Sequence, residues 1–152
     1  VINLGNADVL REYVYIDDLV AAYLFLAENV DRHYSAGIPR TGRGTYGWAA
    51  YNVGSFISSE GKQPEEYSNI RSVRQVIDQV GGIVGADLEP VTIPKPDNFI
   101  EIPDQFLDSG KLHEFGFKPQ IEFEEGLRRT VEWYTQHEEL LSRAGARHVL
   151  SD

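Results

Sequence analysis

The chain has 152 residues, of which 41% are hydrophobic and 25% charged, proportions typical of one globular domain with its own core. It has no cysteine, which excludes disulfides and thiolate metal sites, and its net charge of -10 argues against a nucleic-acid surface, which needs a basic stripe. No apolar run approaches the roughly 20 residues that span a bilayer, and no signal peptide precedes the domain, so we expect a cytoplasmic protein without a membrane partner.

The first predicted elements are a strand and a helix. Residues 11–16 alternate in character and are rich in Tyr and Val, which predicts a strand. Asp17 is a candidate N-cap for a helix that runs to about Asn29, and the acidic pair Asp17 and Asp18 suits the positive end of a helix. Apolar residues recur along this helix at helical spacing, at Val20, Tyr23, Leu24, Ala27 and Val30.

The next segments alternate between loops and short elements. Residues 31–48 form a loop that contains Gly and Arg, and residues 49–53 predict a short apolar strand. Gly54 comes directly after this strand, where we expect it to permit a tight backbone turn. Residues 56–71 predict a polar loop.

A second helix and a third strand come next. Ser72 and Gln75 form a capping box for a helix over about 73–80, which we expect Gly81 and its neighbouring glycine to end. Residues 88–93 then predict a strand, ended by prolines.

Two helices are predicted near the C-terminus. Asp108 or Ser109 caps a short helix that Gly116 ends, and a longer helix runs over about 124–143. We expect residues 138–152 to form a polar tail. The alternating order favours an α/β fold with parallel strands, in a single domain over residues 1–152.

Several segments together resemble one enzyme family. Residues 11–18, R-E-Y-V-Y-I-D-D, resemble the R-D-F-x-x-V-x-D segment of the extended short-chain dehydrogenases/reductases known as NAD-dependent epimerases and dehydratases. Residues 49–55 with 72–77 resemble the family's A-Y-N-V-G-S-G and S-V-x-E unit, and residues 104–134 resemble its D-x-S-K-A-x-x-x-L-G-W-x-P segment and closing helix. The resemblance covers about residues 5–137. It implies the C-terminal portion of a Rossmann-type fold, with parallel strands, flanking helices and a small substrate-binding subdomain.

The sequence departs from the family pattern at three places. Phe56 stands where the family has glycine, Phe117 replaces a tryptophan, and Gly110 is inserted beside the serine–lysine pair. No Tyr-x-x-x-Lys occurs, although that pair supplies the family's catalytic base. No glycine fingerprint for a dinucleotide occurs either. With a start at Val1 and no methionine, we expect a fragment that lacks the N-terminal NAD-binding part and contains no catalytic residue.

The resemblance implies a phosphate contact for Arg11. In the family the arginine at this position binds a phosphate of the nucleotide sugar, and a planar guanidinium suits two phosphate oxygens. The alternative is a surface arginine paired with Asp17 or Asp18. Gln105, at the end of the segment 101–105, is a candidate for a hydrogen bond to the ligand.

A second phosphate-binding arginine, which many relatives carry, is not matched. Lys95 and Asn98 are the candidates near its place, and Arg40 or Arg43 in the Gly-rich loop are possible substitutes. No metal site is expected, because the four histidines show no H-E-x-x-H spacing and have no cysteine partner.

Three functions are consistent with the sequence. We favour the nucleotide-sugar binding half of a parent enzyme, an NAD-dependent nucleotide-sugar 4,6-dehydratase or epimerase (a lyase or isomerase of carbohydrate biosynthesis) of the GDP-mannose or CDP-glucose dehydratase type. The resemblance implies NAD or NADP held by the missing part, a nucleoside diphosphate sugar as substrate, and a homodimer. The alternatives are a stand-alone nucleotide-sugar binding module without catalysis and an α/β interaction domain whose motifs reflect packing only.

Overall fold

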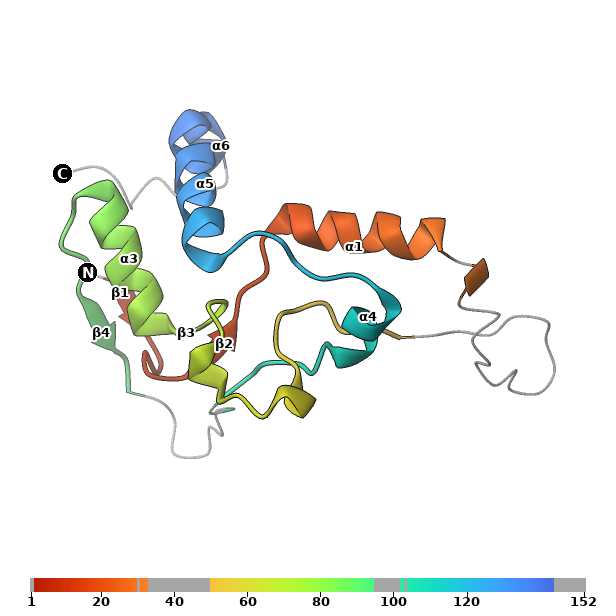
Figure 1. The fold of residues 1–152 in the computed structure, drawn as a ribbon. Helices are drawn as coiled ribbons and strands as arrows, with labels where there is room; N and C mark the ends of the chain where they lie inside the picture. The colour runs from red at the N-terminus through yellow and green to blue at the C-terminus, as the bar shows by residue number, and fades with distance from the viewer. Residues whose placement is uncertain (1, 30, 33–49, 95–101, 103, 144–152) are drawn as a thin grey trace.

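A computed structural model of the chain describes residues 2–29, 31–32, 50–94, 102 and 104–143, and Figure 1 shows how its elements are arranged. In chain order they are β1 (Ile2–Leu4), β2 (Leu10–Glu12), α1 (Ile16–Glu28), the 3-10 helices η1 (Ser58–Glu60) and η2 (Pro64–Glu66), β3 (Ile70–Ser72), α3 (Val73–Val84), β4 (Pro90–Thr92), α4 (Gly110–Phe115), α5 (Phe123–Gln136) and α6 (Glu138–Arg143).

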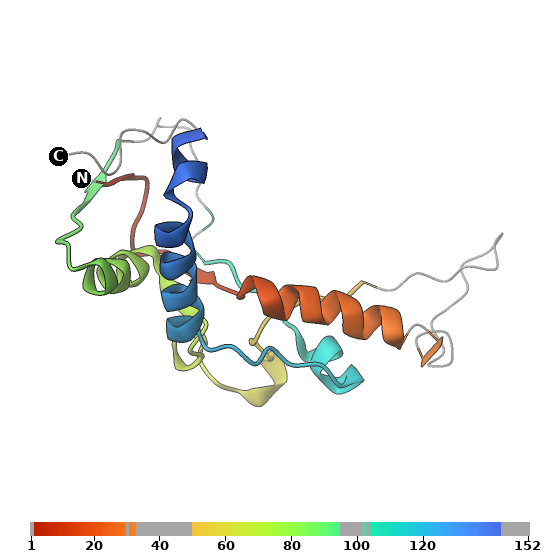
Figure 2. The same cartoon turned by 90° about the horizontal axis from the view of Figure 1, so that it is seen from above.

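The described strands form two pairs. β1 and β4 are parallel, with Asn3 opposite Val91, whereas β2 and β3 are antiparallel, with Arg11 opposite Arg71. α3 begins directly after β3 and packs against α5, and α1 extends away from this group in both ribbon views (Figures 1 and 2). The prediction of α/β structure is therefore confirmed, and β1 and β4 are parallel as expected. β3, which begins in the predicted loop 56–71, pairs antiparallel with β2, so the expectation of parallel strands does not extend to this pair.

The predicted strands are shorter than expected, and one is missing. β2 covers only the start of the segment 11–16, and β4 covers the middle of 88–93. The predicted strand 49–53 is wrong for its described part, since residues 50–53 have no regular structure. A strand needs a neighbour to satisfy its backbone groups, and no described strand pairs with this segment.

Helix starts agree with the sequence only in part. The capping box is confirmed, because the Ser72 hydroxyl accepts from the Gln75 amide and the Gln75 side chain accepts from the Ser72 amide. The prediction of Asp17 as N-cap is wrong. α1 has Tyr15 at that position with no side-chain cap, and Asp17 lies in the first turn, where its charge still favours the helix dipole.

Helix ends also differ from the predictions. α3 continues through Gly81 to Val84 and ends at Gly85, whose φ of 68° lies in the left-handed region. Gly81 is buried, and a Cβ there would lie 2.7 Å from the Ala86 carbonyl oxygen, so this glycine lets the chain fold back closely. α4 ends at Gly116, as predicted.

The last helix is divided. The predicted single helix over 124–143 is wrong at His137, which separates α5 from α6. Part of the predicted polar tail therefore forms α6, and residues 144–152 lie outside the described residues.

Buried side chains are few, and one helix exposes its apolar face. Ile70, Leu112, Tyr67 and Phe123 are buried at the centre. The apolar stripe of α1 points outward instead, with Tyr23 66% and Leu24 60% exposed. No helix in the described parts of the chain combines the length and apolar character that crossing a membrane requires.

The capping box at the start of α3 gives a first prediction. Ser72→Ala removes the acceptor for the Gln75 amide and should lower the free energy of unfolding by about 1 kcal/mol. Urea denaturation followed by circular dichroism measures this change. Ser59→Ala, in the exposed helix η1, is the matched control and should change stability by less than about 0.5 kcal/mol. Equal effects of the two substitutions would contradict the assigned cap.

Candidate functional site

Three distant segments meet at β2, and we call their meeting point the β2 junction (residues 10–12, 54–56 and 104–107). Gln105 pairs with β2 through its backbone, donating to the Leu10 carbonyl at 3.0 Å and accepting from the Glu12 amide at 3.1 Å. The Asp104 carboxylate accepts from the Leu10 amide at 3.0 Å. β3 occupies the other edge of β2, so the strand is hydrogen-bonded on both sides.

Arg11 lies in the middle of this junction. Its guanidinium donates to the Leu10 carbonyl at 2.7 Å and to the Ile102 carbonyl at 3.0 Å. The half-buried side chain is therefore held along the segment that leads into Gln105. Among the ion pairs between described residues, none joins Arg11 to Asp17 or Asp18.

The structure thus brings two of the candidate site residues together and leaves the others undescribed. Arg11 and Gln105 are paired backbone neighbours, and Gln105 is exposed. Lys95 and Asn98 lie outside the described residues, as do Arg40 and Arg43.

Arg71 is a basic residue that the sequence reasoning missed. It is the direct cross-strand partner of Arg11, and directly opposed like charges destabilise a ladder. Its guanidinium donates to the Tyr67 and Ile70 carbonyls and lies 5.7 Å from the centre of the Phe123 ring. Arg71 comes to attention only through the register of β3 with β2, and β3 was not predicted from the sequence.

Side chains replace strand pairing in the segment 50–56. Lys111 donates to the Ala50 carbonyl, Asn52 donates to the Asp108 carbonyl, and a ring nitrogen of His113 lies 2.8 Å from the Gly54 carbonyl oxygen. Glu12 accepts from the amides of Ser55 and Phe56. These contacts hold the end of the segment at the β2 junction without a ladder.

Gly54 has a different role from the one expected. Among the described glycines, positive φ occurs only at Gly61, Gly85 and Gly116, so Gly54 does not serve an unusual turn. A Cβ at Gly54 would instead lie 2.4 Å from Glu12 Oε1. The missing side chain makes room for the Glu12 carboxylate.

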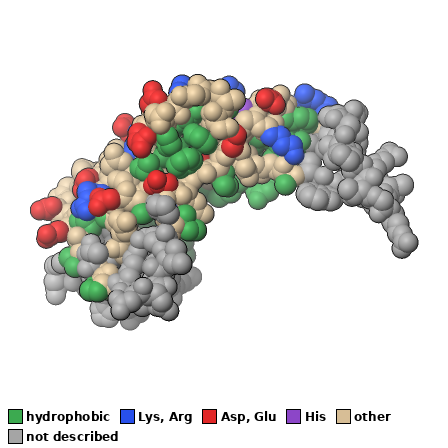
Figure 3. Space-filling view, turned by 90° about the horizontal axis from the view of Figure 1, so that it is seen from below, with side chains coloured by type: hydrophobic (Ala, Val, Ile, Leu, Met, Phe, Trp, Pro, Cys, Tyr) green, Lys and Arg blue, Asp and Glu red, His purple; other side chains and the backbone are tan. Residues whose placement is uncertain are grey.

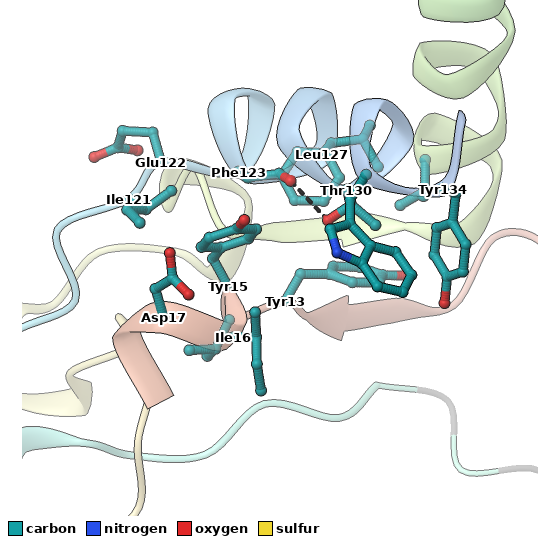
Figure 4. A pocket seen from close by; sticks show the side chains of 14 residues that line it. Tyr13, Tyr15, Ile16, Asp17, Ile121, Glu122, Phe123, Leu127, Thr130 and Tyr134 are labelled. Atoms are coloured by element: carbon teal, nitrogen blue, oxygen red, sulfur yellow. Dashed lines mark hydrogen bonds between the residues drawn. The ribbon is translucent and has the colours of Figure 1, made fainter. Parts of the chain in front are cut away.

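A cleft of about 650 Å³ lies beside the junction, between the β2–α1 connection and α5 (Figure 4). Its side chains are mostly aromatic or aliphatic, and Thr130, whose hydroxyl donates to the Gly126 carbonyl, is one of its few polar residues. We call it the aromatic cleft; it is lined by Tyr13, Val14, Tyr15, Ile16, Asp17, Val76, Ile121, Glu122, Phe123, Gly126, Leu127, Thr130, Trp133 and Tyr134.

Buried aromatic packing shapes the floor of this cleft. The rings of Tyr13 and Phe123 lie 5.3 Å apart, and burial raises the pKa of the Tyr13 phenol. Asp18 is only 4% exposed, and its carboxylate accepts from the amides of Gln120 and Ile121, which fixes the chain before α5. Burial therefore favours the neutral, protonated form of the Tyr13 phenol.

The surface around these features is mixed. On the face shown in Figure 3, apolar side chains reach the surface next to acidic and scattered basic groups. Within the described residues no group of three or more His, Cys, Asp or Glu side chains is placed to hold a metal ion.

Comparison with known proteins identifies relatives. No family model matches the sequence. The probable GDP-L-fucose synthase 1 of rice (Oryza sativa subsp. japonica) is 31% identical over 133 residues, which are 88% of this chain and 32% of the relative. The dTDP-glucose 4,6-dehydratase of Haemophilus influenzae is 26% identical over 141 residues, 86% of this chain and 34% of the relative.

Solved structures of related folds agree with these relatives. The UDP-glucose 4-epimerase of Thermotoga maritima, determined with UDP-glucose, matches with a TM-score of 0.60 and 27% identity over 89% of this chain and 35% of its own. The dTDP-glucose 4,6-dehydratase of Bacillus anthracis, in complex with NAD, matches with a TM-score of 0.57 and 22% identity over 91% of this chain and 35% of its own. At this identity the match supports the fold alone. The chain spans about a third of the length of the relatives it matches.

Asp108, beside the junction, gives a prediction for pH dependence. The Ser58 hydroxyl and then the Gly110 amide donate to its carboxylate and hold its pKa below the ordinary value of 3.8. A folded pKa below the unfolded one stabilises the protein above the unfolded value, and this contribution is lost as the pH falls through the folded pKa.

The stability advantage of the wild type over Asp108→Asn should therefore be full at about pH 5.5 and shrink by about pH 3. Urea denaturation at these two pH values measures it. Asp87→Asn, which removes an exposed carboxylate after α3, is the control for the change in net charge. A difference that grows on acidification would be the opposite sign and would reject the assignment.

Proposed function

Because the homologues of this chain are extended short-chain dehydrogenases/reductases of the NAD-dependent epimerase/dehydratase family, with a Rossmann-type fold, we propose that it is the nucleotide-sugar binding part of such an enzyme. These homologues are nucleotide-sugar epimerases, dehydratases and reductases. A parent enzyme of the relatives' length would contain about twice as much additional chain.

The observation that carries the proposal is the β2 junction. It places Arg11, Gln105 and the end of the segment 50–56 within one small region, although they are distant in sequence. Arg11 and Arg71 are cross-strand partners at β2, and the neighbouring carboxylates of Glu12 and Asp104 accept hydrogen bonds from backbone amides. In our proposal a diphosphate forms charge-assisted hydrogen bonds with the Arg11 guanidinium.

The residues present do not fit a dinucleotide cofactor. Neither a glycine fingerprint nor a Tyr-x-x-x-Lys pair occurs in the sequence. Among the related structures, the Bacillus anthracis dehydratase was solved with NAD and a Pseudomonas aeruginosa protein with NADPH. We therefore assign NAD or NADP to the remainder of the parent enzyme and derive no chemical step from this chain.

The exposed apolar face of α1 supports the proposal that this chain is one part of a larger enzyme. Ile16, Val20, Tyr23 and Leu24 are between 48% and 66% exposed along one helix. Apolar patches of this kind are normally covered by another surface. In our proposal the remainder of the parent enzyme covers them.

The reaction of the parent enzyme is a finer proposal. We assign it as a 4,6-dehydratase or an epimerase. In either reaction a nicotinamide cofactor in the remainder of the enzyme would accept the hydride from sugar C4 and a base there would accept the C4 hydroxyl proton, and the epimerase would return both to the 4-keto sugar. The dehydratase then loses water across C5–C6 and returns hydride to C6. A 4-keto-6-deoxy product from the complete enzyme would identify the dehydratase, and inversion at C4 would identify the epimerase.

Calorimetric titration of the 152-residue chain tests the binding role. We expect GDP or UDP to bind and NAD not to bind, because the chain has Arg11 at the position of the family's phosphate-binding arginine but no dinucleotide fingerprint. Nuclear magnetic resonance should place the strongest amide shifts on nucleotide binding at Arg11 and Gln105. Micromolar binding of NAD, or no binding of any nucleoside diphosphate, would reject this division of roles.

Substitution of Arg11 tests the phosphate contact. Arg11→Ala should weaken nucleoside diphosphate binding by about 10- to 150-fold, the loss expected for one charge-assisted bidentate contact. In the complete enzyme the loss should appear in KM and leave kcat nearly unchanged, since a phosphate remote from C4 binds equally in ground and transition states.

Arg74→Ala is the matched control for Arg11→Ala. Arg74 is exposed and pairs with Asp8, so it carries the same charge in an ion pair that lies outside the three segments of the junction. Its loss should change the affinity by less than about 2-fold, within the range of screened surface charges. A collapse of kcat in Arg11→Ala with KM unchanged would place Arg11 in the chemistry or the fold instead.

A further inference from the structure

Glu12 connects the three segments of the β2 junction. Its Oε1 atom accepts from the Ser55 amide at 2.7 Å, the Phe56 amide at 3.1 Å and the Ser55 hydroxyl at 3.2 Å. Its Oε2 atom accepts from the Leu107 amide at 3.2 Å. One half-buried carboxylate on β2 thus holds both other segments, and each oxygen serves one of them.

Glu12 cannot act by touching the same ligand as Arg11. Successive side chains of a strand point to opposite faces, so Glu12 lies on the face away from Arg11. A carboxylate next to a bound phosphate would also repel it. The backbone amides and the hydroxyl that surround Glu12 compensate its charge, which explains why an anion site can have a glutamate beside its arginine.

The neighbouring segment is shaped to receive this carboxylate. At Gly54 any side chain would overlap Glu12, because a Cβ would lie between 2.4 and 2.7 Å from its carboxyl atoms. The same glycine presents its carbonyl to His113, so the turn is fixed from both sides. Gly54 and Glu12 therefore form a matched pair.

Glu12 also contacts the segment that contains Gln105, the candidate for a hydrogen bond to the ligand. Gln105 is held at β2 by its own backbone, and the amide of Leu107, two residues later, donates to the Glu12 carboxylate. The carboxylate therefore fixes the direction in which the segment leaves Gln105.

We propose that Glu12 is the positioning residue of the anion site, holding the 54–56 turn and the 105–107 segment so that Arg11 and Gln105 face one ligand. This inference rests on the proposed function. It adds a residue whose side chain contacts no ligand and still sets the affinity.

Two variants separate the halves of this contact. Glu12→Gln can keep an oxygen toward Ser55 and Phe56 but then turns an amide donor toward the Leu107 amide, so only that bond is lost. Glu12→Ala loses both. Asp8→Asn, which removes an exposed carboxylate before β2, is the control for charge. For each of these three variants we would measure the hydrogen-exchange rates of single amides and the affinity for GDP and UDP by titration.

We expect faster exchange at Leu107 in Glu12→Gln, with Ser55 and Phe56 still protected, and faster exchange at all three in Glu12→Ala. Affinity for the nucleoside diphosphate should fall by about 5- to 30-fold in Glu12→Ala and less in Glu12→Gln, while Asp8→Asn binds like the wild type. Gly54→Ala alone should also lower the affinity. In the double variant with Glu12→Ala it should lower the affinity little further, because both changes break the same contact.

Two results would overturn the positioning role. One is an affinity of Glu12→Ala within about 2-fold of wild type despite faster exchange at Leu107, which would make the contact purely structural. The other is unchanged exchange at all three amides. Failure of the proposed function is seen separately, as absence of GDP and UDP binding by the wild type itself.

Discussion

The backbone hydrogen bonding on both edges of β2 is the constraint on which the rest of the structure depends. A strand of three residues could not hold its place alone, yet here it has β3 on one edge and Gln105 on the other. Because buried backbone groups are costly to leave unpaired, these bonds fix the register of β2, β3 and the residues around Gln105 relative to one another. The register then decides that Arg11 opposes Arg71 and that Glu12 reaches the 54–56 turn.

Apolar surface is distributed in a way that depends on this arrangement. Ile70 and Leu112 are buried, while the apolar face of α1 and the aromatic cleft remain open to solvent. Trp133 and Tyr134 at the cleft are in contact with each other, with ring centres 5.1 Å apart. A chain that matches a third of its relatives' length can satisfy its interior locally while leaving surfaces suited to a larger assembly.

Local signals in the sequence predicted what is decided locally. The Ser72–Gln75 box and the glycine end of α4 depend on neighbouring residues, and both were predicted correctly. The passage of α3 through Gly81 was not predicted, because the close approach of Ala86 offset the weak helix preference of glycine. The division of the last helix at His137 was not predicted either. The family resemblance indicated Arg11 and Gln105, but only the register of β2 and β3 revealed Arg71 and the contacts of Glu12.

The long sequence separation within the junction has a consequence for how the chain tolerates change. Leu10 and Asp104 are 94 residues apart, and Glu12 and Ser55 are 43 apart. The entropy cost of closing such loops grows only with the logarithm of their length, by roughly 0.6 kcal/mol for each doubling. Insertions or deletions in the irregular connections between these anchor points, outside the helices, β3 and the 54–56 turn, should therefore change the stability of the junction little. Related chains can vary widely in the length of their connections while keeping the same meeting point of strand, turn and segment.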